Sequence, residues 1–141
     1  MTDLADLDTP CLVVDRGKVA ANAERLKSRL ARLGVPLRLH VKTPKSLEAV
    51  ELAVGPGRPP ITVSTLKEAE QFFDAGYRDI LYAVGFSPAK ATRARALVAR
   101  GCNLTIITDS LETARAISGF RVLIEIDTDG HRAGVKPEDE A

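Results

Sequence analysis

The ten residues LRLHVKTPKS, at positions 37–46, decide the fold. Apolar residues alternate there with Arg38, His40 and Lys42, and this period of two predicts a short strand. Thr43-Pro44 follows, and that pair is typical of a helix N-cap and a first helical position. Lys42 is therefore expected where a strand ends and a helix begins. In barrels of alternating strands and helices, chemistry takes place at that end of the strands. From the local pattern alone, a surface lysine in a βα loop is the more common alternative.

Strand and helix patterns alternate outward from this stretch. Apolar residues recur at steps of three and four between Asp15 and Gly34, and Thr65 with Glu68 has the spacing of a capping box. The strands are predicted at 37–42, 61–63, 80–84, 104–107 and 122–126. The helices are predicted at 15–33, 44–54, 65–76, 87–101 and 109–118, with Asp109 or Ser110 capping the last.

This order predicts an α/β fold made of parallel βαβ units. No G-x-G-x-x-G and no G-K-S/T follows any predicted strand, so a barrel segment is preferred to a dinucleotide-binding sheet. A closed barrel needs eight strands and about 250 residues. We therefore expect a partial (β/α) TIM-type barrel of about five parallel strands with intervening helices, either as a compact domain or as part of a longer fold. The connection at 109–121 is only just long enough for a crossover.

Composition excludes several classes of function. The formal net charge is +1 and 45% of residues are hydrophobic, which does not suit a nucleic-acid-binding or membrane-surface protein. No apolar run approaches the roughly 20 residues that span a bilayer. Cys11 and Cys102 lie in or beside apolar stretches without a CxxC partner, so we expect both to be buried and reduced. The cytoplasm is the expected location.

Several motifs, in a fixed order, resemble those of D-threonine aldolases. They are DTP at 8–10, the stretch at 37–46, ITVSTLKEAE at 61–70, DILYAV at 79–84 and IEIDTDGHRAGV at 124–135. D-threonine aldolases and the eukaryotic-type D-serine dehydratases are alanine racemase-like, fold type III pyridoxal phosphate enzymes. The resemblance covers essentially the whole chain.

The resemblance assigns roles to individual residues. Lys42 matches the lysine that forms the internal aldimine with pyridoxal 5'-phosphate, for which a partly desolvated strand end is suitable. Arg132 matches the arginine that approaches the cofactor's phenolic oxygen. His40 either packs beneath the cofactor or orients the strand end. Lys45 is expected to be a solvated charge or a neighbour of the phosphate. Residues 1–141 then form a partial N-terminal barrel domain, and a C-terminal β domain is expected outside this chain.

The resemblance also implies a reaction. It is a retro-aldol cleavage of D-3-hydroxy amino acids, converting D-threonine into glycine and acetaldehyde, with a divalent metal such as Mn or Mg. The metal ligands of this family lie in the C-terminal domain, so none is expected in this chain. Asp127 and Asp129 are interpreted as acids that shape the loop or orient Arg132, and His131 as structural. A homodimer is expected for full-length members.

Other interpretations remain open. D-serine dehydratases share these motifs but remove water instead. A truncated, non-catalytic remnant or an oligomerisation module would keep the same fold signals. The one-domain pyridoxal phosphate homeostasis proteins share the barrel but have different motifs. The sequence departs from the family with Leu39 where proline is usual and with Pro44 where histidine or serine is usual. Half a barrel would leave two open sheet edges, so self-association is expected.

Overall fold

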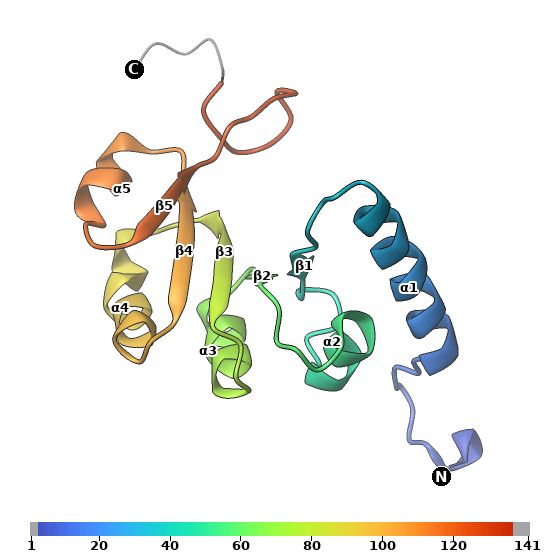
Figure 1. Ribbon diagram of the computed structural model, residues 1–141. Helices are drawn as coiled ribbons and strands as arrows, with labels where there is room; N and C mark the ends of the chain where they lie inside the picture. Colours follow the sequence, from blue (N-terminus) through green and yellow to red (C-terminus); the bar gives the residue numbers. More distant parts are fainter. Residues whose placement is uncertain (1–2, 137–141) are drawn as a thin grey trace.

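The computed structural model describes residues 3–136, which form a five-stranded parallel sheet with a helix between successive strands (Figure 1). The strands are β1 (Leu39–His40), β2 (Ile61–Val63), β3 (Asp79–Gly85), β4 (Asn103–Thr108) and β5 (Arg121–Ile124). The α-helices are α1 (Arg16–Arg32), α2 (Leu47–Val54), α3 (Leu66–Asp74), α4 (Ala91–Ala99) and α5 (Leu111–Ala116). Two 3-10 helices are η1 (Leu4–Asp6) and η2 (Pro88–Lys90).

The strands lie in chain order, β1-β2-β3-β4-β5, and each neighbouring pair is parallel. This confirms the predicted α/β fold of about five parallel strands with intervening helices. In the described part of the chain the sheet does not close on itself, so β1 and β5 are its two edges. All carboxyl ends of the strands therefore meet along one rim, as a barrel segment requires.

The core lies between the central strands and the helices α3 and α4. Ile61, Ile80 and Leu104 stand side by side in neighbouring strands and are at most 2% exposed. They share one buried cluster with Phe72 of α3 and Leu97 of α4. Side chains alternate across a strand, so the intervening residues of β3 face the other side of the sheet, where they are only half-buried. One face of the sheet is covered by helices and the other is open.

Helix α3 begins as the sequence predicts. Thr65 Oγ1 accepts a hydrogen bond from Glu68 N at 3.0 Å, and Glu68 Oε2 accepts one from Thr65 N at 3.2 Å, which completes the capping box. Gly76 follows the helix with a φ of +100°, a conformation that favours glycine.

The predicted helix start at Thr43-Pro44 is wrong. Helix α2 begins three residues later, at Leu47, and Ser46 is its N-cap. Residues 41–44 form a turn, and Lys45 has a φ of 48°. This left-handed conformation is incompatible with a right-handed helix, so α2 cannot begin before Lys45.

Both edge strands are shorter than predicted. β1 contains only two residues, and β5 ends at Ile124, two residues before the predicted end. Ile126 instead forms an isolated bridge with Val135 across the loop that follows β5. Short edge strands are common in native sheets, because they limit the unpaired backbone that could pair with another chain.

The two cysteines differ, and the prediction for Cys11 is wrong. Cys102 is buried, and burial raises the pKa of its thiol to about 11. Cys11 is exposed, as is Leu12 beside it, at 100%. The apolar run at 11–14 fails to become buried because no element of the described chain packs over it.

Helix α1 lies against α2 at one side of the molecule, away from β4 and β5 (Figure 1). Its apolar stripe has the predicted spacing, but none of its residues is fully buried, and Leu26 is 43% exposed. None of the helices in residues 3–136 has the length and hydropathy of a membrane-crossing segment.

Candidate functional site

Lys42 lies at the carboxyl end of β1, on the open face of the sheet. The parallel ladder continues one residue past β1, because Val41 N donates to Thr62 O at 2.9 Å. Val41 is completely buried on the helix side. Alternation then places the side chain of His40 on the opposite face, and the charge of Lys42, in the turn that follows, acts on the His40 ring. The Lys42 side chain is exposed and has no ion pair or hydrogen bond with the other described residues. Its amine is therefore accessible to a ligand.

A tight turn redirects the chain immediately after Lys42. Lys45 N donates to Val41 O at 3.0 Å and closes the turn. The left-handed conformation of Lys45 costs a lysine on the order of 1–2 kcal/mol relative to glycine. A non-glycine residue keeps such a conformation only where surrounding contacts hold it.

His40 connects the backbone of Lys42 to the loop after β2. Its Nδ1 accepts a hydrogen bond from Lys42 N at 3.3 Å, and its Nε2 lies 3.4 Å from Ser64 Oγ. Because Nδ1 accepts, the proton of the neutral ring belongs on Nε2, which donates to Ser64 Oγ. Desolvation, and then the charge of Lys42, lower the pKa of His40, while the charge of Glu68 opposes the shift. His40 is therefore neutral at pH 7, which agrees with the predicted role of orienting the strand end.

Glu68 is a buried carboxylate beside this group, 5% exposed. Its Oε2 accepts from Ser64 N at 2.8 Å in addition to Thr65 N. Its Oε1 is buried without a hydrogen bond, and Lys45 Nζ lies 3.5 Å away as an ion pair. Lys45 is thus an ion-pair partner of α3 in addition to being largely solvated. The sequence marked Glu68 only as a capping-box residue, and neither it nor Ser64 was predicted to belong to the site.

The loop after β5 is shaped by Asp127. Its Oδ1 accepts from Gly130 N at 3.0 Å and from Asp129 N at 3.4 Å. Burial alone would raise the pKa of Asp127, but the backbone N–H groups of Asp129, Gly130 and Arg132 lower it below its usual value. Gly134 is required here, because a Cβ would come within 2.5 Å of Asp127 N. The prediction that Asp127 shapes this loop is confirmed.

Arg132 is exposed in this loop, and its side chain makes no hydrogen bond or ion pair with the other described residues. The loop follows β5 and Lys42 follows β1, so the two lie beyond opposite edges of the sheet (Figure 1). The structure brings together His40, the Lys42 backbone, Ser64 and Glu68, but it does not bring Arg132 to them. The role of Arg132 stays a prediction.

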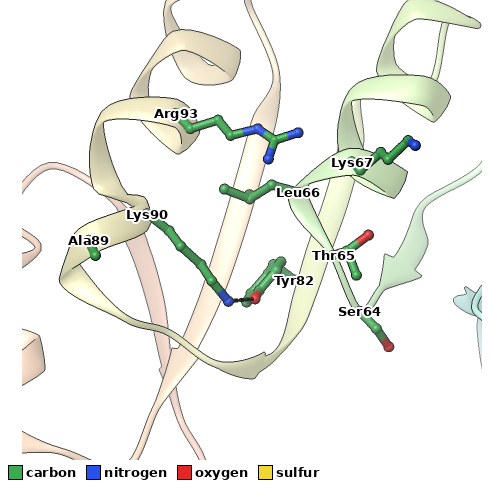
Figure 2. A pocket seen from close by; sticks show the side chains of 8 residues that line it. All are labelled: Ser64, Thr65, Leu66, Lys67, Tyr82, Ala89, Lys90 and Arg93. Atoms are coloured by element: carbon green, nitrogen blue, oxygen red, sulfur yellow. Dashed lines mark hydrogen bonds between the residues drawn. The ribbon is translucent and has the colours of Figure 1, made fainter.

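A hollow of about 430 Å³ lies next to the group around His40, between α3 and the start of α4, and Ser64 is one of its lining residues. Figure 2 shows the residues that line it, among them Tyr82, whose Oη accepts a hydrogen bond from Lys90 Nζ at 2.7 Å. Tyr82 is buried in the core on the helix side of the sheet, whereas Lys42 lies on the open face. Neither His40 nor Lys42 lines this hollow. The site at Lys42 is therefore an open strand end and not this pocket.

Comparison with known proteins places the chain in one family. Residues 14–141 match the family described as alanine racemase, N-terminal domain. The chain is 48% identical to D-threo-3-hydroxyaspartate dehydratase of Delftia sp., over 96% of this chain and 38% of that protein. The crystal structure of that dehydratase has a TM-score of 0.89 over 95% of this chain and 38% of the dehydratase chain.

Two further relatives are more distant. D-serine dehydratase of Dictyostelium discoideum is 31% identical over 96% of this chain and 38% of that protein. The crystal structure of D-threonine aldolase from Filomicrobium marinum is 27% identical, with a TM-score of 0.83 over 96% of this chain and 39% of that chain. All three relatives are much longer than this chain, which spans little more than a third of each.

The fold and these matches define an alanine racemase-like domain of the fold type III pyridoxal phosphate family. The chain belongs to the alanine racemase N-terminal domain family, with relatives among lyases of D-amino acids. This confirms the family inferred from the motifs.

The residues at β1 suit pyridoxal phosphate. The cofactor binds enzymes covalently through a lysine amine, and the unpaired Lys42 amine after β1 meets that requirement, although it is exposed, whereas the sequence predicted partial desolvation. Within residues 3–136, no group of three or more His, Cys, Asp or Glu side chains is arranged to hold a metal ion. The expected divalent metal, with ligands outside this chain, stays a prediction.

Proposed function

We propose that this chain is the cofactor-binding part of a pyridoxal phosphate-dependent lyase that acts on D-3-hydroxy amino acids. The observation that carries the proposal is the accessible Lys42 amine at the carboxyl end of β1, in a chain that belongs to the alanine racemase N-terminal domain family. The relatives are more than twice as long, so this chain supplies only part of the proposed catalytic machinery.

The residues of the chain have distinct proposed roles. Lys42 holds the cofactor covalently, and neutral His40 fixes the strand end by accepting a hydrogen bond from Lys42 N. Arg132 approaches the cofactor's phenolic oxygen as a permanently charged guanidinium. When bound, the cofactor accepts the electron pair released at the substrate's α-carbon.

The first candidate reaction is the retro-aldol cleavage of D-threonine into glycine and acetaldehyde, by similarity to D-threonine aldolase. The second candidate is dehydration of a D-3-hydroxy amino acid, and the higher identity to the Delftia dehydratase favours it. Both reactions begin with the same cofactor and the same bound amino acid, and they differ in whether a carbon–carbon or a carbon–oxygen bond breaks. A divalent metal, Mn or Mg, and a homodimer are proposed for the complete enzyme.

Cofactor titration tests the role of Lys42. Addition of pyridoxal phosphate to the chain should give the visible absorbance band of a Schiff base, and Lys42→Ala should abolish it. Lys67→Ala is the matched control, since Lys67 is also exposed and lies in the first turn of α3, the helix that follows β2. A band that persists in Lys42→Ala, or no band in the wild-type chain, would contradict the proposal.

Product analysis separates the two reactions. The loaded chain is incubated with Mn and with D-threonine, D-serine or D-threo-3-hydroxyaspartate. Glycine with an aldehyde identifies the aldolase reaction, and an oxo acid with ammonia identifies the dehydratase. If the D-amino acids leave the Schiff-base spectrum unchanged, the chain is a non-catalytic module with the same fold.

A further inference from the structure

Glu68 makes more polar contacts than a capping box requires. A capping box requires one side-chain oxygen to accept from the N-cap backbone, and Glu68 Oε2 already accepts from two N–H groups, those of Ser64 and Thr65. The second oxygen, Oε1, is buried and receives no hydrogen bond. Leaving a buried carboxylate oxygen without a hydrogen bond is unfavourable unless a cation compensates for it.

The compensating cation is Lys45, whose Nζ lies 3.5 Å from Glu68 Oε1. The Lys45 side chain is 63% exposed and that of Glu68 only 6%, so the pair joins a solvated ammonium to a buried carboxylate and is screened less than a pair of two exposed charges. Its effect is geometric, because Lys45 is the residue with a φ of 48° that closes the turn beginning at Lys42. The ion pair with α3 holds this lysine in a conformation that lysine rarely adopts.

A second connection runs from the same loop to the same strand end. The Ser64 backbone is held by Glu68, while the Ser64 hydroxyl lies 3.4 Å from His40 Nε2. The other ring nitrogen of His40 accepts from Lys42 N. Glu68 therefore acts on the backbone of Lys42 from both sides, through Ser64 and His40 before it and through Lys45 after it.

We propose that Glu68, together with Lys45, is a positioning residue that fixes the turn at residues 42–45 and thereby directs the Lys42 amine onto the open face of the sheet. This inference rests on the proposed function, because it concerns the delivery of Lys42 to pyridoxal phosphate. Glu68 touches neither cofactor nor substrate and acts through the backbone.

The variant Glu68→Gln isolates the ion pair. The glutamine oxygen can still accept from Ser64 N and Thr65 N, which leaves the NH₂ group to face the Lys45 ammonium. Two donors then oppose each other, so the ion pair is lost while the cap is kept. Thr65→Ala is the matched control, because it removes the hydroxyl that caps α3 and leaves both charges in place.

The experiment measures how fast pyridoxal phosphate forms a borohydride-reducible adduct on Lys42, by peptide mass spectrometry. Glu68→Gln should slow labelling of Lys42 about tenfold. Thr65→Ala should lower the unfolding midpoint but label at the wild-type rate. Adding Lys45→Gly to Glu68→Gln should restore most of the rate, because glycine adopts the left-handed conformation without an ion pair.

A cofactor-free readout accompanies the labelling. The Lys45 amide, bonded to Val41 O, should exchange with solvent faster in Glu68→Gln than in Thr65→Ala. The inference alone is overturned if wild-type and Glu68→Gln label at the same rate, or if Thr65→Ala is slowed as much as Glu68→Gln. Absence of Lys42 labelling in the wild-type chain overturns the proposed function and this inference with it.

Discussion

The centre of the sheet and its two sides contain similar apolar residues, but the centre buries them more completely. Ile80 and Ile106, on β3 and β4, are completely buried against α3 and α4. At the edges, Leu26 of α1 is 43% exposed and Ile124 of β5 is 71% exposed. The amphipathic pattern is present in both regions, so the difference lies in the neighbours that each region has in the fold.

This comparison bears directly on the proposed site. Lys42 follows the edge strand β1, yet the residues that hold its backbone, Ser64 and Glu68, lie in the β2–α3 connection and in α3, in the well-packed region. Arg132, by contrast, follows the opposite edge strand and has no side-chain partner among residues 3–136. The Lys42 part of the proposed cofactor site is therefore held by residues packed against the core, whereas the Arg132 part is not.

The largest difference should appear in core truncation. Phe72→Ala removes a fully buried ring that packs edge-on against Tyr77, and it should cost about 3–5 kcal/mol of unfolding free energy. Leu26→Ala, on the half-exposed face of α1, should cost less than about 1 kcal/mol. Urea denaturation followed by circular dichroism measures both. If Phe72→Ala does not fold, Ile80→Val provides the milder core variant, at about 0.5–1.5 kcal/mol.

The exposed edge should make the chain self-associate. The backbone of β5 has no partner strand on its outer side, because β5 is an edge of the sheet. Its apolar side chains Val122, Leu123 and Ile124 are exposed. Burying one isoleucine side chain in an interface would contribute about 1.5–3 kcal/mol to association. Ile124→Lys should therefore raise the dissociation constant of the self-associated form by roughly ten- to a hundredfold. Sedimentation velocity over a range of concentrations measures this effect.

Val98→Lys is the control for that experiment, since Val98 is exposed on α4, away from both edges. It should leave association unchanged. If the wild-type chain remains monomeric at every concentration, the open sheet edges do not cause self-association.

Helix caps in the two regions should differ by a smaller amount. Thr65→Ala should cost about 1 kcal/mol, because α3 is buried and its cap is coupled to global folding. Asp15→Ala removes the cap of α1 but should change global stability by only a few tenths of a kcal/mol, since α1 buries no residue fully. Denaturation midpoints give the global effect, and amide exchange within α1 should reveal its local fraying. Equal losses of global stability would contradict the comparison.

The smallest effect should come from the titration of His40. Desolvation and Lys42 lower its pKa in the folded chain, so around pH 6 the unfolded chain binds more protons than the folded chain. The contribution of His40 to the free energy of unfolding should therefore be fully present above its unfolded-state pKa of about 6.5. It should be lost as the pH decreases through the lower pKa that His40 has in the folded chain. His40→Gln should reduce this acid-dependent loss between pH 7 and pH 5, as measured by urea midpoints at both values. An unchanged pH dependence would show that His40 titrates identically in both states.

The regular part of the fold was predictable from the sequence. Each strand and helix of the sheet follows a local pattern, and the capping box at Thr65 and Glu68 is itself a sequence motif. The turn after Lys42 was not predictable in the same way. Thr43-Pro44 is a plausible helix start, and the reason it fails is the left-handed Lys45, which is paired with a carboxylate on another element.

The proposed site divides along the same line. The motif resemblance located Lys42, and the structure places it at an accessible strand end. Glu68 was visible only as a local cap, because its second oxygen acquires a partner only when β1 and β2 lie side by side. Cys11 was expected to be buried because it begins an apolar run at 11–14. The sequence does not indicate that no element among the described residues packs over this run.

The central claim is that Lys42 is the residue that carries pyridoxal phosphate. The most direct measurement is borohydride reduction of the chain with pyridoxal phosphate, followed by quantitative peptide mapping of all lysines. We expect a pyridoxyl group concentrated on Lys42, with Lys45 and Lys67 at background level. Label spread evenly over the exposed lysines, or an unchanged total label in Lys42→Ala, would contradict it.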